Sequence, residues 1–232
     1  MAKRVLIEIC VESLALAVAA ERGGAERIEL CSDLSVGGVT PNTELMRSVR
    51  QSVSIPIHVL IRPRAGDFCY SAQEFERMRH EIGLAKEIGM DGIVAGVLTP
   101  SGEVDGERTR ALVGLAHPLS VVFHRAFDQV PDMRSALEAV IETGAKRILT
   151  SGGVRDAMDH LDSLEQLVVD ARERIVIMPG GGIRASHAAE IVASTKAAEI
   201  HTSLGALELG STPDGAALFE ERVRQFKHAV HS

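Results

Sequence analysis

The sequence has few cysteines, no surplus of positive charge and no long apolar run, and each of these absences excludes a class of protein. Three cysteines, an odd number at unpatterned spacing, argue against a disulfide framework and for a reducing compartment. The formal net charge is -7 and no basic stripe is present, so a nucleic-acid-binding surface is not expected. No apolar stretch approaches the length needed to span a bilayer. We therefore expect a cytoplasmic protein that binds neither nucleic acid nor membrane.

The first residues superficially resemble a secretory signal, because a basic start is followed by an apolar run. Three carboxylates, Glu8, Glu12 and Glu21, interrupt the apolar region, so no signal peptide is expected. No linker or low-complexity segment divides the chain. A length of 232 residues is ordinary for one barrel domain. We therefore expect a single domain that covers residues 1–232.

What the sequence does have is a regular alternation of strand and helix signals. Short apolar runs alternate with Ala/Leu-rich segments, several of which end at glycine. The expected strands are Arg4–Cys10, Arg27–Cys31, Ile55–Arg62, Gly92–Gly96, Leu119–His124, Arg147–Thr150, Arg174–Met178 and Ala198–Thr202. The expected helices are Val11–Arg22, one that opens at Pro41, Ser71–Ile88, Gly106–Ala116, one from Asp132 to Gly144, Asp156–Ala171, Ala185–Ser194 and Gly215–His231. This order requires a parallel sheet with covered faces.

The fold class is therefore α/β, and the number of strands favours a single (β/α)8 TIM-type barrel over an open doubly wound sheet. Side chains two apart on a strand share one face, so Glu8 lies with Cys10 and Glu29 with Cys31. Both faces of an open sheet are covered by helices, and these charges would have no place there. A barrel mouth provides one, while Ile9 and its neighbours turn toward the helices.

The same alternation extends this polar face to other strands. His58 and Arg62 continue it on the third strand, and His124, Glu199 and His201 are expected to join it from the fifth and eighth strands. The sequence therefore predicts a polar interior at one end of the barrel, and this end is where a function should lie.

Glycine-rich segments follow the sixth and seventh predicted strands, and a serine follows the eighth. Glycine lets backbone N–H groups approach a ligand, and barrels often hold phosphate near the loops after strands seven and eight. These glycines could instead only form tight turns, but three consecutive glycines exceed what one turn requires. The predicted anion-binding residues are Gly152, Gly153, Gly180, Gly181, Gly182 and Ser203.

Several motifs together resemble the CutC family. The resemblance covers about Val5 to Ser203, and its motifs are residues 8–13, 27–31, 37–41, 56–68, 123–128, 149–153 and 178–182. It implies a barrel fold, a cytoplasmic location and an association with copper homeostasis. It also implies that Cys10 and Cys31 bind Cu(I).

The residues themselves support copper only in part. Thiolate is the soft ligand that Cu(I) prefers, and thiols at the ends of neighbouring strands can converge. However, no Cys-x-x-Cys motif, methionine cluster or histidine-rich tract accompanies Cys10 and Cys31, and a buried cysteine often only packs as a small apolar side chain. Cys69, in the loop after the third strand, is interpreted as incidental.

The alternative is an isomerase- or lyase-type enzyme that acts on a small phosphorylated or carboxylated metabolite. Two neighbouring carboxylates can serve as acid and base because their repulsion raises the pKa of one, and histidines exchange protons near neutral pH. Arginines can hold an anion. The candidate catalytic residues are Glu8, Glu29, His58, Arg62, His124 and His201, with Arg64 as a second clamp for the anion. No lysine faces inward, so Schiff-base chemistry is disfavoured. The same residues could be structural, as in a buried Glu8–Arg62 ion pair. The expected partners are a small anion or a metal ion, and a homo-oligomer remains open.

Overall fold

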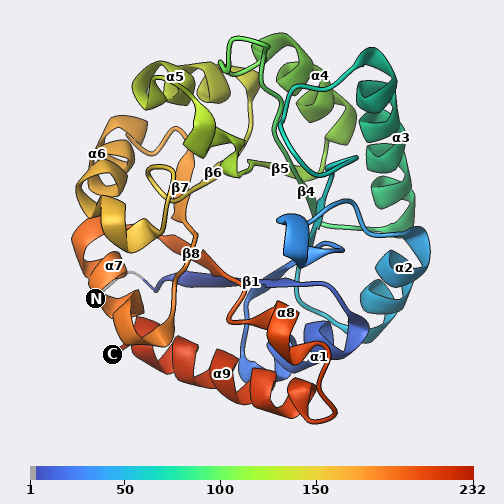
Figure 1. Cartoon of the computed structure of the whole chain (residues 1–232), viewed down its shortest axis with the longest axis vertical. Coiled ribbons are helices and arrows are strands. Elements are labelled where there is room, and N and C mark those ends of the chain that lie inside the picture. Colours follow the sequence, from blue (N-terminus) through green and yellow to red (C-terminus); the bar gives the residue numbers. More distant parts are fainter. Residues whose placement is uncertain (1–3) are drawn as a thin grey trace.

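The computed structural model describes residues 4–232, and it shows a ring of parallel strands enclosed by helices (Figure 1). The strands are β1 (Leu6–Val11), β2 (Arg27–Leu30), β3 (Ile57–Leu60), β4 (Gly92–Ala95), β5 (Ser120–Phe123), β6 (Arg147–Thr150), β7 (Val176–Pro179) and β8 (Glu199–Thr202). The predicted (β/α)8 barrel is thus confirmed. The predicted strands were correct in place and order, and most of them were one to four residues too long.

The strands pair in the sheet order β7-β6-β5-β4-β3-β2-β1-β8, with parallel registers between neighbours. Ile9 of β1, for example, lies opposite Ile28 of β2 on one side and Thr202 of β8 on the other. Within residues 4–232 no ladder joins β7 to β8, although the two strands stand side by side in the ring (Figure 1). The barrel is therefore nearly closed.

The main helices cover the outside of this ring. They are α1 (Leu14–Gly23), α2 (Thr43–Ser52), α3 (Ala72–Ile88), α4 (Gly106–Ala116), α5 (Met133–Thr143), α6 (Leu161–Ala171), α7 (Ala185–Thr195) and α9 (Gly215–Val230). Three short segments were not predicted: η1 (Leu34–Val36), η2 (Arg125–Gln129) and α8 (Ala206–Leu209). The helix predicted at Asp156–Ala171 begins with a separate 3-10 turn, η3 (Ala157–His160), and continues as α6. No helix of the described chain is long and apolar enough to cross a membrane.

Local capping explains where the helices begin and end. The Ser13 hydroxyl accepts a hydrogen bond from the Leu16 N–H at 3.3 Å, so α1 begins after Ser13. The start predicted for this helix, at Val11, was too early. Ser71 and Glu74 form a capping box that starts α3. Gly89 ends α3 at φ +83°, a left-handed conformation that glycine adopts without strain.

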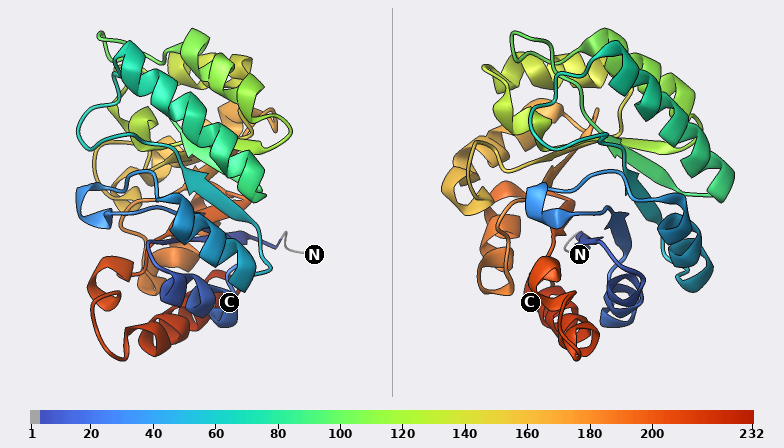
Figure 2. Two further views of the ribbon diagram at one scale, coloured as in Figure 1. Left: turned by 90° about the vertical axis from the view of Figure 1, so that its right-hand side faces the viewer. Right: turned by 45° about the vertical axis from the view of Figure 1, so that its right-hand side comes forward.

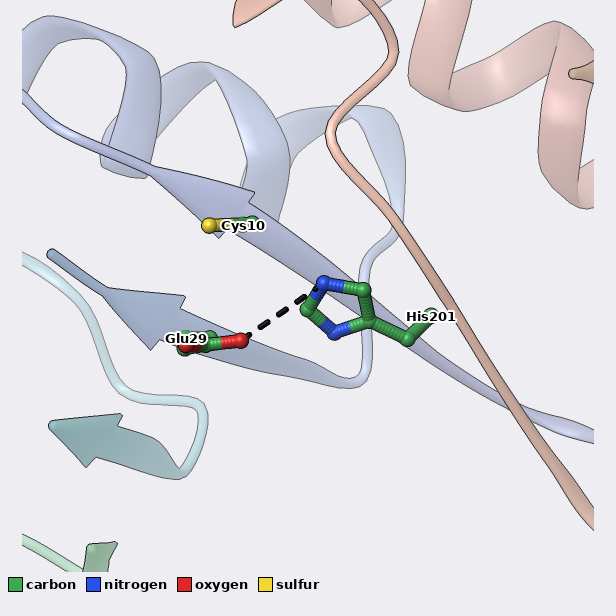
Figure 3. A group of neighbouring side chains, drawn as sticks. All are labelled: Cys10, Glu29 and His201. Carbon is green, nitrogen blue, oxygen red and sulfur yellow. Dashed lines mark ion pairs between the residues drawn. The ribbon is translucent and has the colours of Figure 1, made fainter. Parts of the chain in front are cut away.

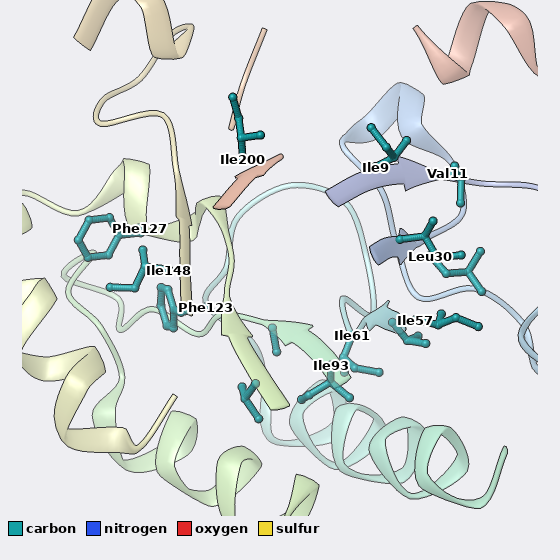
Figure 4. Packing of buried hydrophobic residues seen from close by; sticks show 14 of the residues in the cluster. Ile9, Val11, Leu30, Ile57, Ile61, Ile93, Phe123, Phe127, Ile148 and Ile200 are labelled. Atoms are coloured by element: carbon teal, nitrogen blue, oxygen red, sulfur yellow. The ribbon is translucent and has the colours of Figure 1, made fainter. Parts of the chain in front are cut away.

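Two separate apolar clusters show which side chains face in and which face out. Ile9, Leu30, Ile61 and Ile93 belong to the large cluster between the strands and the helices (Figure 4). The smaller cluster fills the barrel interior with one residue from each of seven strands or their ends: Cys10, Cys31, Leu60, Val94, Val122, Leu149 and Met178. The predicted inward direction of both thiols and the outward direction of Ile9 and Leu30 are confirmed.

The last helix closes the outer layer. α9 lies beside α1 in every view, so the two ends of the chain are neighbours in the helical layer (Figures 1 and 2). Gly23 allows this close approach, because an added Cβ would lie 2.6 Å from the Cβ of Val223. Phe219 and Phe226 of α9 are fully buried in the outer cluster.

Candidate functional site

A cavity of about 730 Å³ opens at the C-terminal ends of the strands. This is the end at which barrel enzymes carry their active sites. Sequence-predicted residues that line it are Cys10, Glu29, Arg62, His124, Gly181, Gly182, His201 and Ser203. The strand alternation thus brings residues from the two ends of the chain to one cavity.

Two predicted catalytic residues do not reach this cavity. Glu8 is wholly buried beneath it, and His58 is 3% exposed at the same depth. Their carboxylate and ring lie 3.5 Å apart, from Oε2 of Glu8 to Nδ1 of His58. Burial lowers the pKa of His58 to about 4, although the Glu8 charge acts in the opposite direction. Any role of these two groups toward a ligand in the cavity is therefore indirect.

A buried ion network lies below the cavity floor. Arg27 pairs with Glu8 and, at 2.5 Å, with Glu199, which also accepts a hydrogen bond from Arg147 at 2.7 Å. Burial opposes the charged form of Glu8, but Arg27 and His201 outweigh it and hold its pKa well below the usual range. The structural alternative named Arg62 as the partner of Glu8, and this was wrong, since Glu8 pairs with Arg27. Sequence reasoning missed Arg27, although it lies two residues before Glu29 and therefore on the same face.

The floor of the cavity carries one carboxylate and one imidazole in contact. Oε2 of Glu29 lies 3.5 Å from Nε2 of His201, and Figure 3 shows both side chains pointing toward each other from β2 and β8. Burial raises the pKa of Glu29 to about 7. Burial acts against the charge on His201, but a hydrogen bond to Glu8 and the charge of Glu29 raise its pKa. This pair can therefore exchange a proton with a ligand near neutral pH.

The two strand-end thiols meet at the same level. Sγ of Cys10 lies 3.6 Å from Sγ of Cys31. Cys10 also lies beside Glu29 and His201: its sulfur, a carboxylate oxygen of Glu29 and a ring nitrogen of His201 all lie within 4.8 Å of one another (Figure 3). The hydrogen bond to Cys31, together with burial, raises the pKa of the Cys10 thiol. Cys10, Glu29 and His201 are therefore close enough to hold one metal ion, and the Cys31 sulfur adjoins Cys10 as a second soft donor of the kind that Cu(I) prefers. Cys69 lies apart, in the loop after β3.

Arg62 and His124 also line the cavity. Both side chains are buried, with exposed fractions of 6% and 5%. Arg64, predicted to act with Arg62, turns away and pairs with Glu74 at 2.6 Å and Asp67 at 2.9 Å. Of the two arginines predicted to act together, Arg62 is therefore the one placed to hold an anion in the cavity.

The glycine segments divide into two groups. Gly181 and Gly182, at φ +111° and +65°, line the cavity. The N–H groups of Gly152 and Gly180 already donate to Oγ1 and O of Thr150, both at 2.9 Å, and these two glycines lie outside the cavity lining. Gly153 packs instead against His160 of η3. The geometry thus restricts the predicted anion contacts to Gly181, Gly182 and Ser203.

The loop after β5 is attached to β6 by a buried carboxylate. Asp128 accepts hydrogen bonds from Oγ1 of Thr150 at 2.5 Å and from the N–H of Ser151 at 3.0 Å. It also pairs with Nε of Arg125 at 2.7 Å, and this arginine reaches the cavity. Asp128 therefore positions Arg125, which the sequence analysis did not single out.

The charged lining of the cavity is mainly positive, in contrast to the negative chain. No lysine lines it in the described part of the chain, as expected. The cavity is lined by four arginines and two glutamates, which are Arg62, Arg125, Arg184, Arg222, Glu29 and Glu208. The charged side chains around the cavity therefore include more positive than negative groups.

Comparison with known proteins agrees with the motifs noted in the sequence. The model of the CutC family matches residues 5–206. The chain belongs to the CutC family. A human relative, named copper homeostasis protein cutC homolog, is 49% identical over 198 residues, which are 85% of this chain and 72% of the human protein. A CutC family protein of Chromobacterium violaceum is 43% identical over 198 residues, 85% of this chain and 80% of that protein.

A CutC crystal structure shares the fold. It comes from Streptococcus agalactiae, is described as a copper homeostasis protein, and superposes with a TM-score of 0.82 at 32% identity. The match covers 86% of this chain and 98% of that chain. The barrel described above is thus the CutC barrel.

Proposed function

We propose that this CutC protein binds Cu(I) at the barrel mouth through Cys10 and Cys31, with His201 as the third donor, and acts in copper homeostasis. The observation that carries the proposal is the 3.6 Å contact between the two sulfurs, with the His201 ring beside that of Cys10. Thiolate and imidazole are donors that Cu(I) prefers. The names of the human and streptococcal relatives support the same assignment.

The positions of the thiols define how an ion would reach them. Cys10 borders the cavity, whereas Cys31 is fully buried behind it, so the ion enters through the mouth. Both thiols release protons on binding a metal, and the raised pKa of Cys10 makes binding weaker as the pH falls. All three cysteines are free, which supports a reducing, cytoplasmic location.

Anaerobic competition for Cu(I) with a chromogenic chelator tests this function. We expect the double change Cys10→Ser and Cys31→Ser to abolish tight binding, since hydroxyls are poor Cu(I) ligands. Cys69→Ser is the matched control, because it removes the third thiol outside the site. Equal affinities of the unchanged protein and the double variant would refute the proposal.

A second function is favoured by the size and charge of the cavity. A space of about 730 Å³ lined by four arginines exceeds what one metal ion needs and is suited to a small phosphorylated or carboxylated metabolite. Glu29 and His201 lie at its floor and can move a proton beside a carbonyl, as an isomerase or lyase requires. The absence of lysine from the described lining disfavours a Schiff base.

Native purification followed by mass spectrometry of the small molecules retained by the protein tests the second function. We expect an organic anion to copurify and to be converted by the purified protein. Conversion should be lost in Glu29→Gln and should survive Cys31→Ser, which leaves the cavity lining intact. If conversion is lost in Cys31→Ser and retained in Glu29→Gln, this acid/base mechanism is excluded.

A further inference from the structure

Arg62 carries a buried charge that has no anionic partner. Its guanidinium donates to the carbonyls of Val36 at 3.0 Å, Gly38 at 2.7 Å and Gly66 at 2.9 Å, and to no carboxylate within residues 4–232. Its Nε is buried and has no acceptor at hydrogen-bonding geometry in this part of the chain, and the buried Tyr70 hydroxyl near Arg62 also lacks a partner. Buried charges in proteins are normally paired, and an unmade hydrogen bond of a buried donor costs about 1–3 kcal/mol. The contacts therefore fix the position of the charge and leave it uncompensated.

His124 presents a second donor without an acceptor. Its Nδ1 accepts a hydrogen bond from the Ala126 N–H at 3.2 Å, so Nε2 carries the proton of the neutral ring. This Nε2 is buried and has no partner in the described chain. Burial, together with the charge of Arg62, lowers the pKa of His124 to about 3, so the ring is neutral at physiological pH. His124 is thus a neutral donor held in one orientation.

An aromatic side chain brings the two donors together. The guanidinium of Arg62 lies 5.1 Å from the ring centre of Phe68, and that ring lies 4.8 Å from the ring of His124. All three side chains line the same wall of the cavity. Both side chains are thus held against Phe68, and within residues 4–232 neither Nε of Arg62 nor Nε2 of His124 has an acceptor.

We propose that Arg62 and His124 bind the carboxylate group of a small organic acid. A carboxylate offers two acceptor oxygens and one negative charge, which matches two free donors and one uncompensated positive charge. A phosphate dianion would bring a second charge, for which the neutral His124 provides no partner. This carboxylate is the ligand class that the second proposed function, an isomerase or lyase, would act on. The inference rests on that function only in treating the bound acid as a substrate. It does not depend on the thiols, which lie on β1 and at the end of β2.

Titration of the protein with sodium acetate and sodium propionate, followed by ¹⁵N NMR of the histidine rings, tests this site. We expect saturable binding that shifts the Nε2 signal of His124, because this N–H gains an acceptor. Arg62→Gln should weaken binding at least tenfold. Arg64→Gln is the matched control: it changes a nearby arginine that pairs with Glu74 and leaves the cavity untouched, so affinity should stay within twofold.

Further variants keep the test decisive. If Arg62→Gln does not fold, as judged by circular dichroism, then Arg62→Lys and His124→Phe, each of which removes one of the two donors, should weaken acetate binding instead. Glu29→Gln should retain it, and this result separates the carboxylate site from the acid/base function. Inorganic phosphate that binds more tightly than acetate and is lost in the Arg62 variants, or an unchanged acetate affinity in the Arg62 and His124 variants, would overturn the proposal.

Discussion

The ring of His201 bridges the two carboxylates that the sequence places on neighbouring strands. Its Nδ1 lies 2.8 Å from Oε1 of Glu8, and its Nε2 lies 3.5 Å from Oε2 of Glu29. Glu8 belongs to the buried ion network, and Glu29 lines the cavity. Because the His201 ring contacts both Glu8 and Glu29, the buried ion network beneath the cavity fixes the orientation of a ring that faces a ligand in the cavity. Glu8 therefore acts on the site by positioning His201 rather than by contact with a ligand.

Replacement of Glu8 by glutamine should destabilise the fold strongly. The change leaves the buried Arg27 with one carboxylate partner instead of two, and breaking a buried ion pair costs about 3–5 kcal/mol. Urea denaturation measures the free energy of unfolding. Glu138→Gln, which removes an exposed ion pair with Arg174, should cost about 1 kcal/mol or less. Equal effects of the two changes would contradict the structural role of Glu8.

Stability should depend on pH through Glu29. The folded protein releases the Glu29 proton near pH 7, whereas the unfolded chain releases it near pH 4.5, so the folded state binds more protons between these values. The Glu29 contribution to stability therefore falls as the pH rises through this range, by about 3.5 kcal/mol at most at about 1.4 kcal/mol per pKa unit.

Glu29→Gln abolishes this loss, because glutamine resembles the protonated acid. Between pH 5 and pH 8, the free energy of unfolding of the variant should therefore rise relative to that of the unchanged protein. Urea denaturation at several pH values measures the gain. Glu87→Gln, the same change at an exposed position, is the control. A difference between variant and unchanged protein that stays constant with pH would show that the pKa of Glu29 is not raised.

The three inward histidines should titrate separately. Burial lowers the pKa of His58 to about 4 and that of His124 to about 3, whereas the hydrogen bond to Glu8 overcomes burial and raises the pKa of His201. At pH 5.5 we expect two neutral rings and one charged ring in ¹⁵N NMR spectra. A common transition of all three near pH 6.5 would show that their surroundings do not shift their pKa values.

The phosphate prediction now depends on Gly181. A valine there would be strained at φ +111°, and its Cβ would lie 3.1 Å from the guanidinium of Arg125. We expect Gly181→Val to weaken inorganic phosphate binding at least tenfold, as measured by calorimetry. Gly89→Val is the control, because Gly89 has φ +83° and no atom within 4 Å of the added Cβ. Unchanged phosphate affinity in the Gly181 variant would exclude the site.

Much of the site could be predicted because its residues sit on strands. The alternation of Glu8-x-Cys10 and Glu29-x-Cys31 identified the inward face, and Ile9 and Leu30 pack outward as expected. Arg27 was overlooked, although the same rule includes it. Arg125 could not be found in this way, because it lies in η2, where no alternation operates and where its contact with Asp128 sets its direction.

The sequence alone determined the barrel, the family and the polar end, because strand alternation, helix caps and family motifs are local patterns. The tertiary structure decided which polar groups reach the cavity. Glu8 and Glu29 read alike in the sequence, but one is paired with Arg27 beneath the floor and the other faces a ligand. Arg62 and Arg64 differ in the same way, since Asp67 and Glu74 turn Arg64 aside, whereas Arg62 pairs with no carboxylate within residues 4–232. Depth in the barrel and the choice of ion partner depend on contacts between distant segments, and no local pattern encodes them.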